Sequence, residues 1–128
     1  MISLEEVKFI HEILILKFGG AKGIRDLALL ESAINRPFQT FDSQELYPSA
    51  IEKAAAIFES IIINHPFIDG NKRTAFQLMY LFLMDGQLVL KASHDEIYDF
   101  VIQASEGKLK FDQIKDWIAK NSGPLARG

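Results

Sequence analysis

The chain contains no cysteine and only three histidines, at positions 11, 65 and 94. Without cysteine, disulfide bonds and thiolate metal sites are excluded. The histidines are far apart in the sequence, which argues against a histidine-rich zinc site. Any chemistry must therefore come from single histidines or from other side chains.

The sequence also lacks an excess of positive charge, since its net charge is −3. This argues against a nucleic-acid-binding protein that relies on a broad basic face, while a small basic site remains compatible. No apolar run reaches the roughly 20 residues of a membrane span, and Glu5 and Glu6 interrupt the first segment before it resembles a signal peptide. We expect a cytoplasmic protein without a membrane or direct nucleic-acid partner.

Helical periodicity dominates what the sequence does contain. Its 128 residues, 48% of them hydrophobic, suit one globular domain. Capping signals such as Ser3 with Glu6 and Ser93 with Glu96 mark helix starts, and Pro48 suits a first helical turn. The predicted helices cover residues 4–18, 27–35, 48–64, 71–84, 94–104 and 111–121.

The fold class expected from this pattern is an all-α bundle of six helices. Residues 71–84 are apolar nearly all round, which is typical of a buried central helix. Residues 38–47 show little periodicity and are predicted to form a long, partly exposed loop. We expect a single domain over residues 1–121 and a disordered tail over residues 122–128.

The run His65-Pro66-Phe67-Ile68-Asp69-Gly70-Asn71-Lys72-Arg73 connects two of these apolar segments. In a helix starting near Asn71, two cations occupy the first turn, where the macrodipole makes each cost roughly 0.3–1 kcal/mol. Free amides, the dipole and two positive side chains together favour a bound anion such as a phosphate.

Each residue of the run also has a purely structural interpretation. His65 follows Ile61 by four residues, so it can continue the buried face of its helix as a packed histidine. Asp69 and Gly70 form a common turn pair. Asn71 can be an N-cap, and Lys72 and Arg73 can be solvated surface charges.

Functionally, His65 is suited to accept a proton from an attacking hydroxyl. Asp69 offers a hard oxygen ligand for Mg²⁺, and Gly70 lets the backbone approach a ligand closely. Phe67 has no such chemistry and is interpreted as the apolar anchor of the loop. The separate structural interpretations leave the clustering of these residues unexplained, so we favour the functional one.

Other conspicuous side chains receive structural interpretations. His11 is expected to pack on the first helix, His94 to lie at an exposed helix start and Trp117 to dock in the core. The aromatic residues of the long loop either cover a site or pack on their own scaffold, namely Phe38, Phe41 and Tyr47.

The run His65 to Arg73 closely resembles the signature of Fic/Doc proteins, His-Pro-Phe-x-Asp/Glu-Gly-Asn-x-Arg. Further segments resemble the shorter death-on-curing branch, so that the resemblance covers about residues 1–120. They are Gly19-Gly20, Gly23-Ile24-Arg25-Asp26, Leu29-Leu30-Glu31-Ser32-Ala33 and Arg36-Pro37. That branch comprises toxins of toxin–antitoxin pairs. The resemblance implies a Fic/Doc-type six-helix bundle, with residues 38–47 as a flap that positions the target segment.

The resemblance also implies roles for the motif. His65 would deprotonate a target hydroxyl, Asp69 would hold Mg²⁺ on the nucleotide phosphates, and Gly70 and Asn71 would form the anion hole. The adjacent cations, Lys72 and Arg73, would contact phosphates. ATP is the implied co-substrate.

Two positions depart from the members that transfer AMP. Those have Gly where this chain has Lys72, and a second Arg where it has Phe76. The death-on-curing branch shares the Lys and transfers the γ-phosphate of ATP to a threonine of elongation factor Tu, which arrests translation. AMP transfer by the same site is the alternative. A further alternative is an inactive module that binds an antitoxin, whose disordered carboxy-terminal segment would fold as a helix in a groove that the sequence does not locate.

Overall fold

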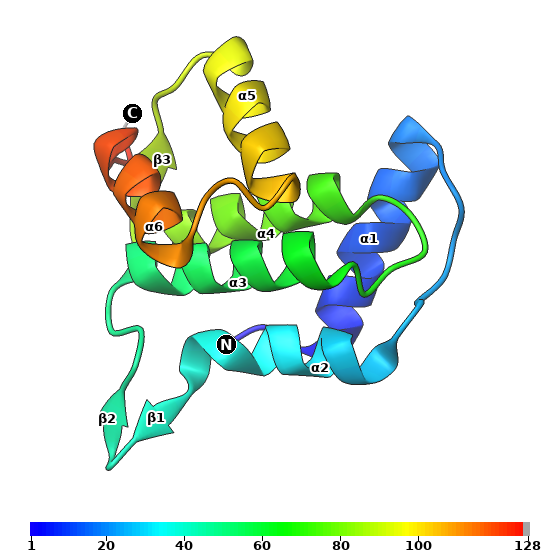
Figure 1. The fold of residues 1–128 in the computed structure, drawn as a ribbon, viewed down its shortest axis with the longest axis horizontal. Coiled ribbons are helices and arrows are strands. Elements are labelled where there is room, and N and C mark those ends of the chain that lie inside the picture. The colour runs from blue at the N-terminus through cyan, green and yellow to red at the C-terminus, as the bar shows by residue number, and fades with distance from the viewer. Residues whose placement is uncertain (127–128) are drawn as a thin grey trace.

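The structure, a computed structural model of the chain, describes residues 1–126. It confirms the expected bundle of six helices, arranged as Figure 1 shows. The helices are α1 (Leu4–Phe18), α2 (Leu27–Asn35), α3 (Ala50–Asn64), α4 (Asn71–Asp85), α5 (His94–Ser105) and α6 (Phe111–Lys120). A 3₁₀ turn, η1 (Arg36–Phe38), follows α2. None of the helices described is long and apolar enough to cross a membrane.

The helices begin where local capping predicts. Ser3, Asp26, Ser49 and Ser93 each accept a hydrogen bond from an amide in the first turn of the helix that follows. Pro48 is not in a helix, because Ser49 is the N-cap of α3 and the helix starts at Ala50. The other boundaries lie within about one residue of the prediction.

Helices α3 and α4 lie side by side at the centre of the molecule (Figure 1). Of the two, α3 is the more deeply buried. Helix α4 lies at the centre as predicted, but it buries only one face, because Met84 is exposed and other apolar side chains of α4 are half-buried. The side chains that α4 buries are Thr74, Ala75, Leu78, Met79 and Leu83.

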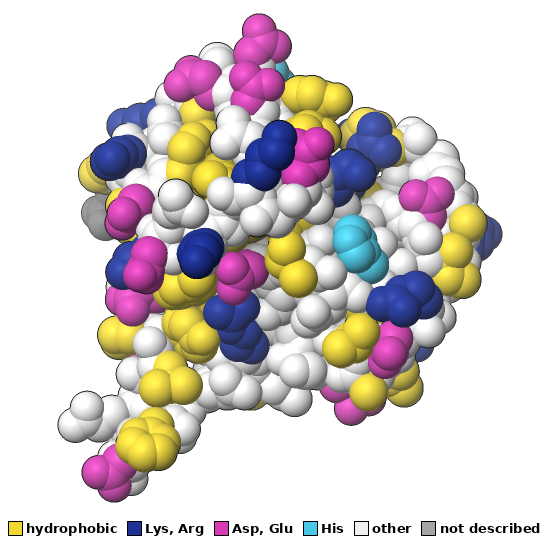
Figure 2. Space-filling model, viewed as in Figure 1, with side chains coloured by type: hydrophobic (Ala, Val, Ile, Leu, Met, Phe, Trp, Pro, Cys, Tyr) yellow, Lys and Arg dark blue, Asp and Glu magenta, His cyan; other side chains and the backbone are white. Residues whose placement is uncertain are grey.

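The segment predicted as a loop over residues 38–47 contains a short antiparallel hairpin, β1 (Thr40–Phe41) and β2 (Gln44–Glu45). The hairpin projects from the lower left of the molecule in Figures 1 and 2. Phe38 packs against Phe82 and Tyr47 against Phe111, with ring centroids 6.0 and 5.4 Å apart, so these two rings belong to the scaffold. Phe41 is 76% exposed.

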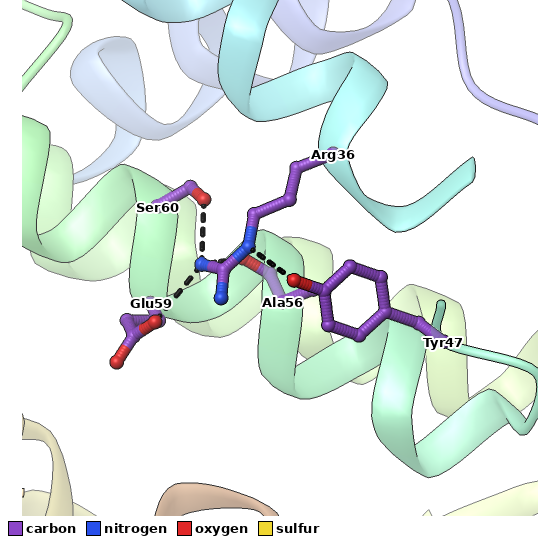
Figure 3. Close-up of polar contacts among 5 residues, drawn as sticks. All are labelled: Arg36, Tyr47, Ala56, Glu59 and Ser60. Carbon is purple, nitrogen blue, oxygen red and sulfur yellow. Dashed lines mark hydrogen bonds and ion pairs between the residues drawn. The ribbon is translucent and has the colours of Figure 1, made fainter. Parts of the chain in front are cut away.

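Arg36 ties this segment to α3, as Figure 3 shows. Its guanidinium donates to the Tyr47 hydroxyl at 3.0 Å, to Glu59 at 2.9 Å and to Ser60 at 3.0 Å. The pKa of Arg36 is raised, because the hydrogen bonds and charges of Tyr47 and Glu59 outweigh desolvation by burial, the largest single cause. The group is therefore a permanent charge that fixes the base of the hairpin.

The hairpin lies at the start of α3, and the 15 residues of this helix separate it from the motif by about 22 Å. None of the residues 38–47 lines the groove at the motif that is described below. The role of this segment as a flap that positions a target segment stays a prediction.

The carboxy-terminal segment is structured further than expected. Strand β4 (Ser122–Pro124) pairs with β3 (Leu88–Leu90), and the amide of Leu125 donates to the carbonyl of Gln87 at 2.9 Å. The prediction of a disordered tail starting at residue 122 was wrong for this strand. Part of the predicted tail, residues 127–128, lies outside the described residues.

Candidate functional site

The motif begins where α3 ends. His65 is the C-cap of α3 and has φ +48°, a left-handed conformation that is uncommon for a residue with a side chain. The chain turns out of the helix there, so the side chain of His65 is exposed and does not continue the buried face, although the structural interpretation of this residue required it to do so. An exposed imidazole is accessible to a substrate hydroxyl. Figure 2 shows a histidine side chain at the surface of the face in view.

Phe67 anchors the loop in the core, where it is almost completely buried. Its ring stacks on that of His11 in α1, with centroids 3.8 Å apart and planes 6° apart. The Nε2 atom of His11 lies 2.8 Å from the carbonyl oxygen of Asp69. His11 is packed as predicted, but its direct contact with the motif was missed, because no sequence pattern indicates that α1 lies beside this loop.

Asn71 closes the loop through its side chain. Its Oδ1 accepts from the amide of Phe67 and its Nδ2 donates to the carbonyl of the same residue, both at 3.0 Å. The N-cap of α4 is Gly70, with φ +76°, and it supplies no side-chain hydrogen bond. The first-turn amides of α4 are therefore not capped by a side chain and can bind an anion.

Asp69 is held in place by backbone amides. Its Oδ2 accepts from Ala21 at 3.1 Å and its Oδ1 from Gly70 at 2.9 Å. These two hydrogen bonds lower the pKa of Asp69, and the charges of Lys72 and His11 lower it further, against a smaller desolvation effect. A Cβ on Gly20 would lie 2.8 Å from Oδ2, so glycine allows the close approach of this segment to the carboxylate.

The carboxylate of Asp69 fits a magnesium ion. It is exposed and ionised, and each oxygen retains acceptor capacity beyond the single hydrogen bond it receives. Mg²⁺ usually takes one or two protein carboxylates together with waters and substrate phosphates. Within residues 1–126 no group of three acidic or histidine side chains gathers, so a magnesium ion here would depend on oxygens from a ligand.

Both cations of the motif are exposed. The Cζ atom of Arg73 lies 4.4 Å from the centre of the Phe18 ring in α1, a cation–π contact. Within the part of the chain that the structure describes, neither Lys72 nor Arg73 forms an ion pair. The first turn of α4 contains no acidic residue either. Among the described residues, the two cations at this helix start are therefore not held in ion pairs, although the charge of Lys72 acts on the nearby carboxylate of Asp69.

The motif faces α5 across a groove of about 630 Å³. One wall carries His65, Asp69, Lys72 and Arg73, and α5 supplies an apolar opposite wall beginning at His94. His94 is exposed as predicted. Its position in the same groove was not predicted, because the orientation of α5 depends on packing between distant segments. The α5 residues that line the groove are His94, Ile97, Tyr98, Val101 and Ile102.

A short segment before α2 supports the loop from behind. Ile24 and Phe67 form an antiparallel bridge, and the amide of Ile68 donates to the carbonyl of Gly23 at 3.1 Å. The amides of Arg25 and Asp26 both donate to the carbonyl of Pro66, at 2.7 and 3.0 Å. The family resemblance includes residues 23–26, but the sequence gave no indication of this contact.

The chain is similar to a known protein family and to several of its named members. Residues 1–83 match the family described as "Fic/DOC family". "Toxin Doc" of Mycolicibacterium smegmatis is 41% identical over 78 residues, which are 61% of this chain and 60% of that protein. "Protein kinase doc" of Escherichia phage P1 is 29% identical over 122 residues, 95% of both chains. "Protein adenylyltransferase Fic" of Drosophila melanogaster is 33% identical over 92 residues, 69% of this chain but 18% of that protein.

Proposed function

The chain belongs to the Fic/Doc family, and from this premise we propose that it is a Doc-like toxin that transfers the γ-phosphate of Mg-ATP to a hydroxyl of a protein target. The observation that carries the proposal is one groove that combines an exposed histidine, an ionised carboxylate and an uncapped, cationic helix start. The similarity to a phage protein kinase over 95% of both chains supports phosphoryl transfer.

In this mechanism His65 accepts the proton of the target hydroxyl. The hydroxyl oxygen bonds to the γ-phosphorus, and the bond from that phosphorus to the bridging oxygen of ADP breaks. The backbone at Gly70 and Asn71, with Lys72 and Arg73, binds the phosphates, and Asp69 holds Mg²⁺. When bound, the ion supplies charge neutralisation. Positioning and electrostatic stabilisation contribute most of the catalysis in such a transfer.

Two positions favour phosphoryl over AMP transfer. Lys72 adds a long cationic side chain to the groove, which would crowd the anion hole and change how phosphates lie in it. Phe76 is half-buried, and the centroid of its ring lies 6.3 Å from that of Tyr80. Because phenylalanine carries no charge, this position offers no second cation to bind distal phosphates. The adenylyltransferase relatives keep AMP transfer as the alternative, although the match covers only 18% of such a protein.

The target is proposed to be a threonine of elongation factor Tu, in line with the family resemblance. Modification of this factor would arrest translation, which would account for a toxin. This role requires the cytoplasm, where the factor and ATP both occur.

A label-transfer assay tests the proposal. The purified protein, Mg²⁺ and a bacterial lysate are incubated with ATP labelled at the α or the γ phosphate. Label from the γ position alone, on a protein of the size of elongation factor Tu, is expected. His65→Ala should abolish it without unfolding the protein, whereas His94→Ala, in the same groove, is the matched control and should retain it. Label from the α position would instead show that the protein transfers AMP and not the γ-phosphate.

An antitoxin is the proposed partner, and an exposed apolar stripe on α1 supports this part of the proposal. Phe9, Ile13 and Leu16 are 62%, 44% and 74% exposed and recur at the spacing of one helix face. Such a stripe suits an amphipathic helix formed by a segment that is disordered when free. Leu16→Glu should weaken rescue of growth by the antitoxin while the toxicity persists. If the protein transfers no label but binds an antitoxin, the inactive module is the correct alternative.

A further inference from the structure

We infer that Arg25 is a positioning residue that sets the orientation of His65. The inference rests on the proposed function for its kinetic consequence, but its structural basis is independent of which group is transferred. The Nε of Arg25 donates to the carbonyl of His65 and its Nη2 to the carbonyl of Asn64, both at 2.6 Å. The side chain therefore binds two consecutive carbonyl oxygens at the end of α3.

These carbonyls need an external partner. The last carbonyls of an α-helix have no intrahelical donor, and a cation at this end also interacts favourably with the macrodipole. A guanidinium presents several N–H groups in a rigid plane and can serve two acceptors at once. A lysine ammonium in its place keeps the charge but lacks this planar arrangement of donors.

The conformation of His65 is what this contact stabilises. Its φ of +48° is sparsely populated by residues with a side chain, and such conformations persist when the surrounding structure over-determines them. Arg25 fixes the carbonyl of His65, and the amides of Arg25 and Asp26 fix the carbonyl of Pro66. The peptide groups that follow His65 are thus held at two successive points, which restricts the direction of its Cα–Cβ bond.

Within residues 1–126, the side chain of Arg25 forms no hydrogen bond or ion pair with the phosphate-binding part of the motif. Its hydrogen bonds reach residues 64–66, whereas the anion-binding amides and cations follow from residue 70 onward. Loss of Arg25 should therefore displace the proton acceptor and leave nucleotide binding intact. If Arg25 served only as a helix cap, its loss would instead change only the stability of the fold.

The test compares Arg25→Ala and Arg25→Lys with Lys22→Ala, which removes an exposed cation from the same segment. We expect Arg25→Ala to lower kcat by at least about tenfold, since a misplacement of about 1 Å can cost as much as 100-fold. Its KM for ATP should stay within about twofold of wild type, and Arg25→Lys should be intermediate. Lys22→Ala should match wild type in kcat and KM. Unchanged kcat in Arg25→Ala, or equal effects of Arg25→Ala and Lys22→Ala, would overturn the inference.

A second readout separates this inference from the proposed function. The ring and backbone NMR signals of His65 should shift and broaden in Arg25→Ala, while those of His94 stay unchanged. This holds even if the wild-type protein transfers no phosphate. If Arg25→Ala does not fold, the same comparison on Arg25→Lys decides, and wild-type His65 signals in that variant would contradict the positioning role.

Discussion

At the residue scale, the exposed position of His65 rests on a left-handed backbone conformation at the end of α3. The clustering of His65, Asp69 and the two cations was predicted, and the structure brings them to one groove. The exposure of His65 was not, because it depends on a left-handed backbone that Arg25, 40 residues away, helps to stabilise. The predicted helix ends at residue 64, as α3 does, but helical spacing does not show how the chain leaves the helix after it.

The sequence pattern also did not predict the role of the Asn71 side chain. An asparagine at a helix start usually suggests an N-cap. Here Gly70 occupies that position, and the side-chain amide of Asn71 forms hydrogen bonds with the backbone of Phe67. The side chain shapes the loop, so the contribution of Asn71 to anion binding is expected to come from its backbone amide. Local propensities cannot distinguish these two uses of one residue.

One buried side chain should cost stability. The hydroxyl of Thr74, in the first turn of α4, is completely buried and has no hydrogen-bond partner within the described residues. Thr74→Val keeps the shape and removes the unpaired group, so we expect about 1 kcal/mol of added stability and a melting temperature about 4 °C higher, measured by calorimetry.

The matched control for this substitution is Ser60→Ala. Ser60 is also buried, but its hydroxyl accepts from Arg36 at 3.0 Å. Removing a satisfied acceptor should lower the melting temperature. A Thr74→Val protein that melts below wild type would show that the hydroxyl of Thr74 is in fact hydrogen-bonded.

At the element scale, α4 shows why a hydrophobic helix need not be buried all round. Most residues of α4 from Ala75 onward are apolar, yet one side of the helix start borders the groove opposite α5. Apolar periodicity records how much surface an element prefers to bury. It does not record which part of that surface faces a groove, because this depends on where the next helix packs.

The start of α5, which forms the edge of the groove, should be sensitive to acid. The amide of Ser93 donates to Glu96, and this hydrogen bond, with that of the Ser93 side chain, holds the pKa of Glu96 below its ordinary 4.5. A carboxyl whose pKa is lowered in the folded state stabilises it above the unfolded pKa and loses that contribution as pH falls through the folded one. We expect the first turn of α5 to fray as pH falls below 4.5.

Amide hydrogen exchange of the first turn of α5, followed across this pH range, measures the fraying. Glu96→Gln provides the control, because its side chain still accepts a hydrogen bond but does not titrate. Equal pH dependence of exchange in wild type and Glu96→Gln would refute the link to this carboxyl group.

At the scale of the whole molecule, the fold class and the six helices were predicted, because caps and periodicity are local signals. What the sequence left open is how distant segments meet. The hairpin of residues 40–45 lies at the end of α3 away from the site, and strand β4 pairs with β3. Both features depend on contacts between segments, which a pattern read along one chain does not contain.

The boundary of the domain can be tested by truncation. A chain ending at Asn121 lacks β4, which pairs with Leu88, Val89 and Leu90. Each backbone hydrogen bond contributes about 0.5–1.5 kcal/mol, so we expect the free energy of unfolding in urea to fall by about 2 kcal/mol. A chain ending at residue 126 is the control and should unfold as the full chain does. If the full chain and the two truncated chains were equally stable, the domain would end at residue 121, as the sequence predicted.

The contacts that hold the motif loop also bear on the order in which the molecule folds. They join residues 39, 40, 48 and 58 positions apart in the sequence, whereas α3 and α4 are joined by a connection of only six residues, 65–70. Closing a longer loop costs more conformational entropy before any contact offsets it. The pair of central helices should therefore form first, and the geometry of the motif loop should appear only when the amino-terminal segment docks on it. A newly made chain would pass through a compact state in which the groove at the motif is not yet assembled.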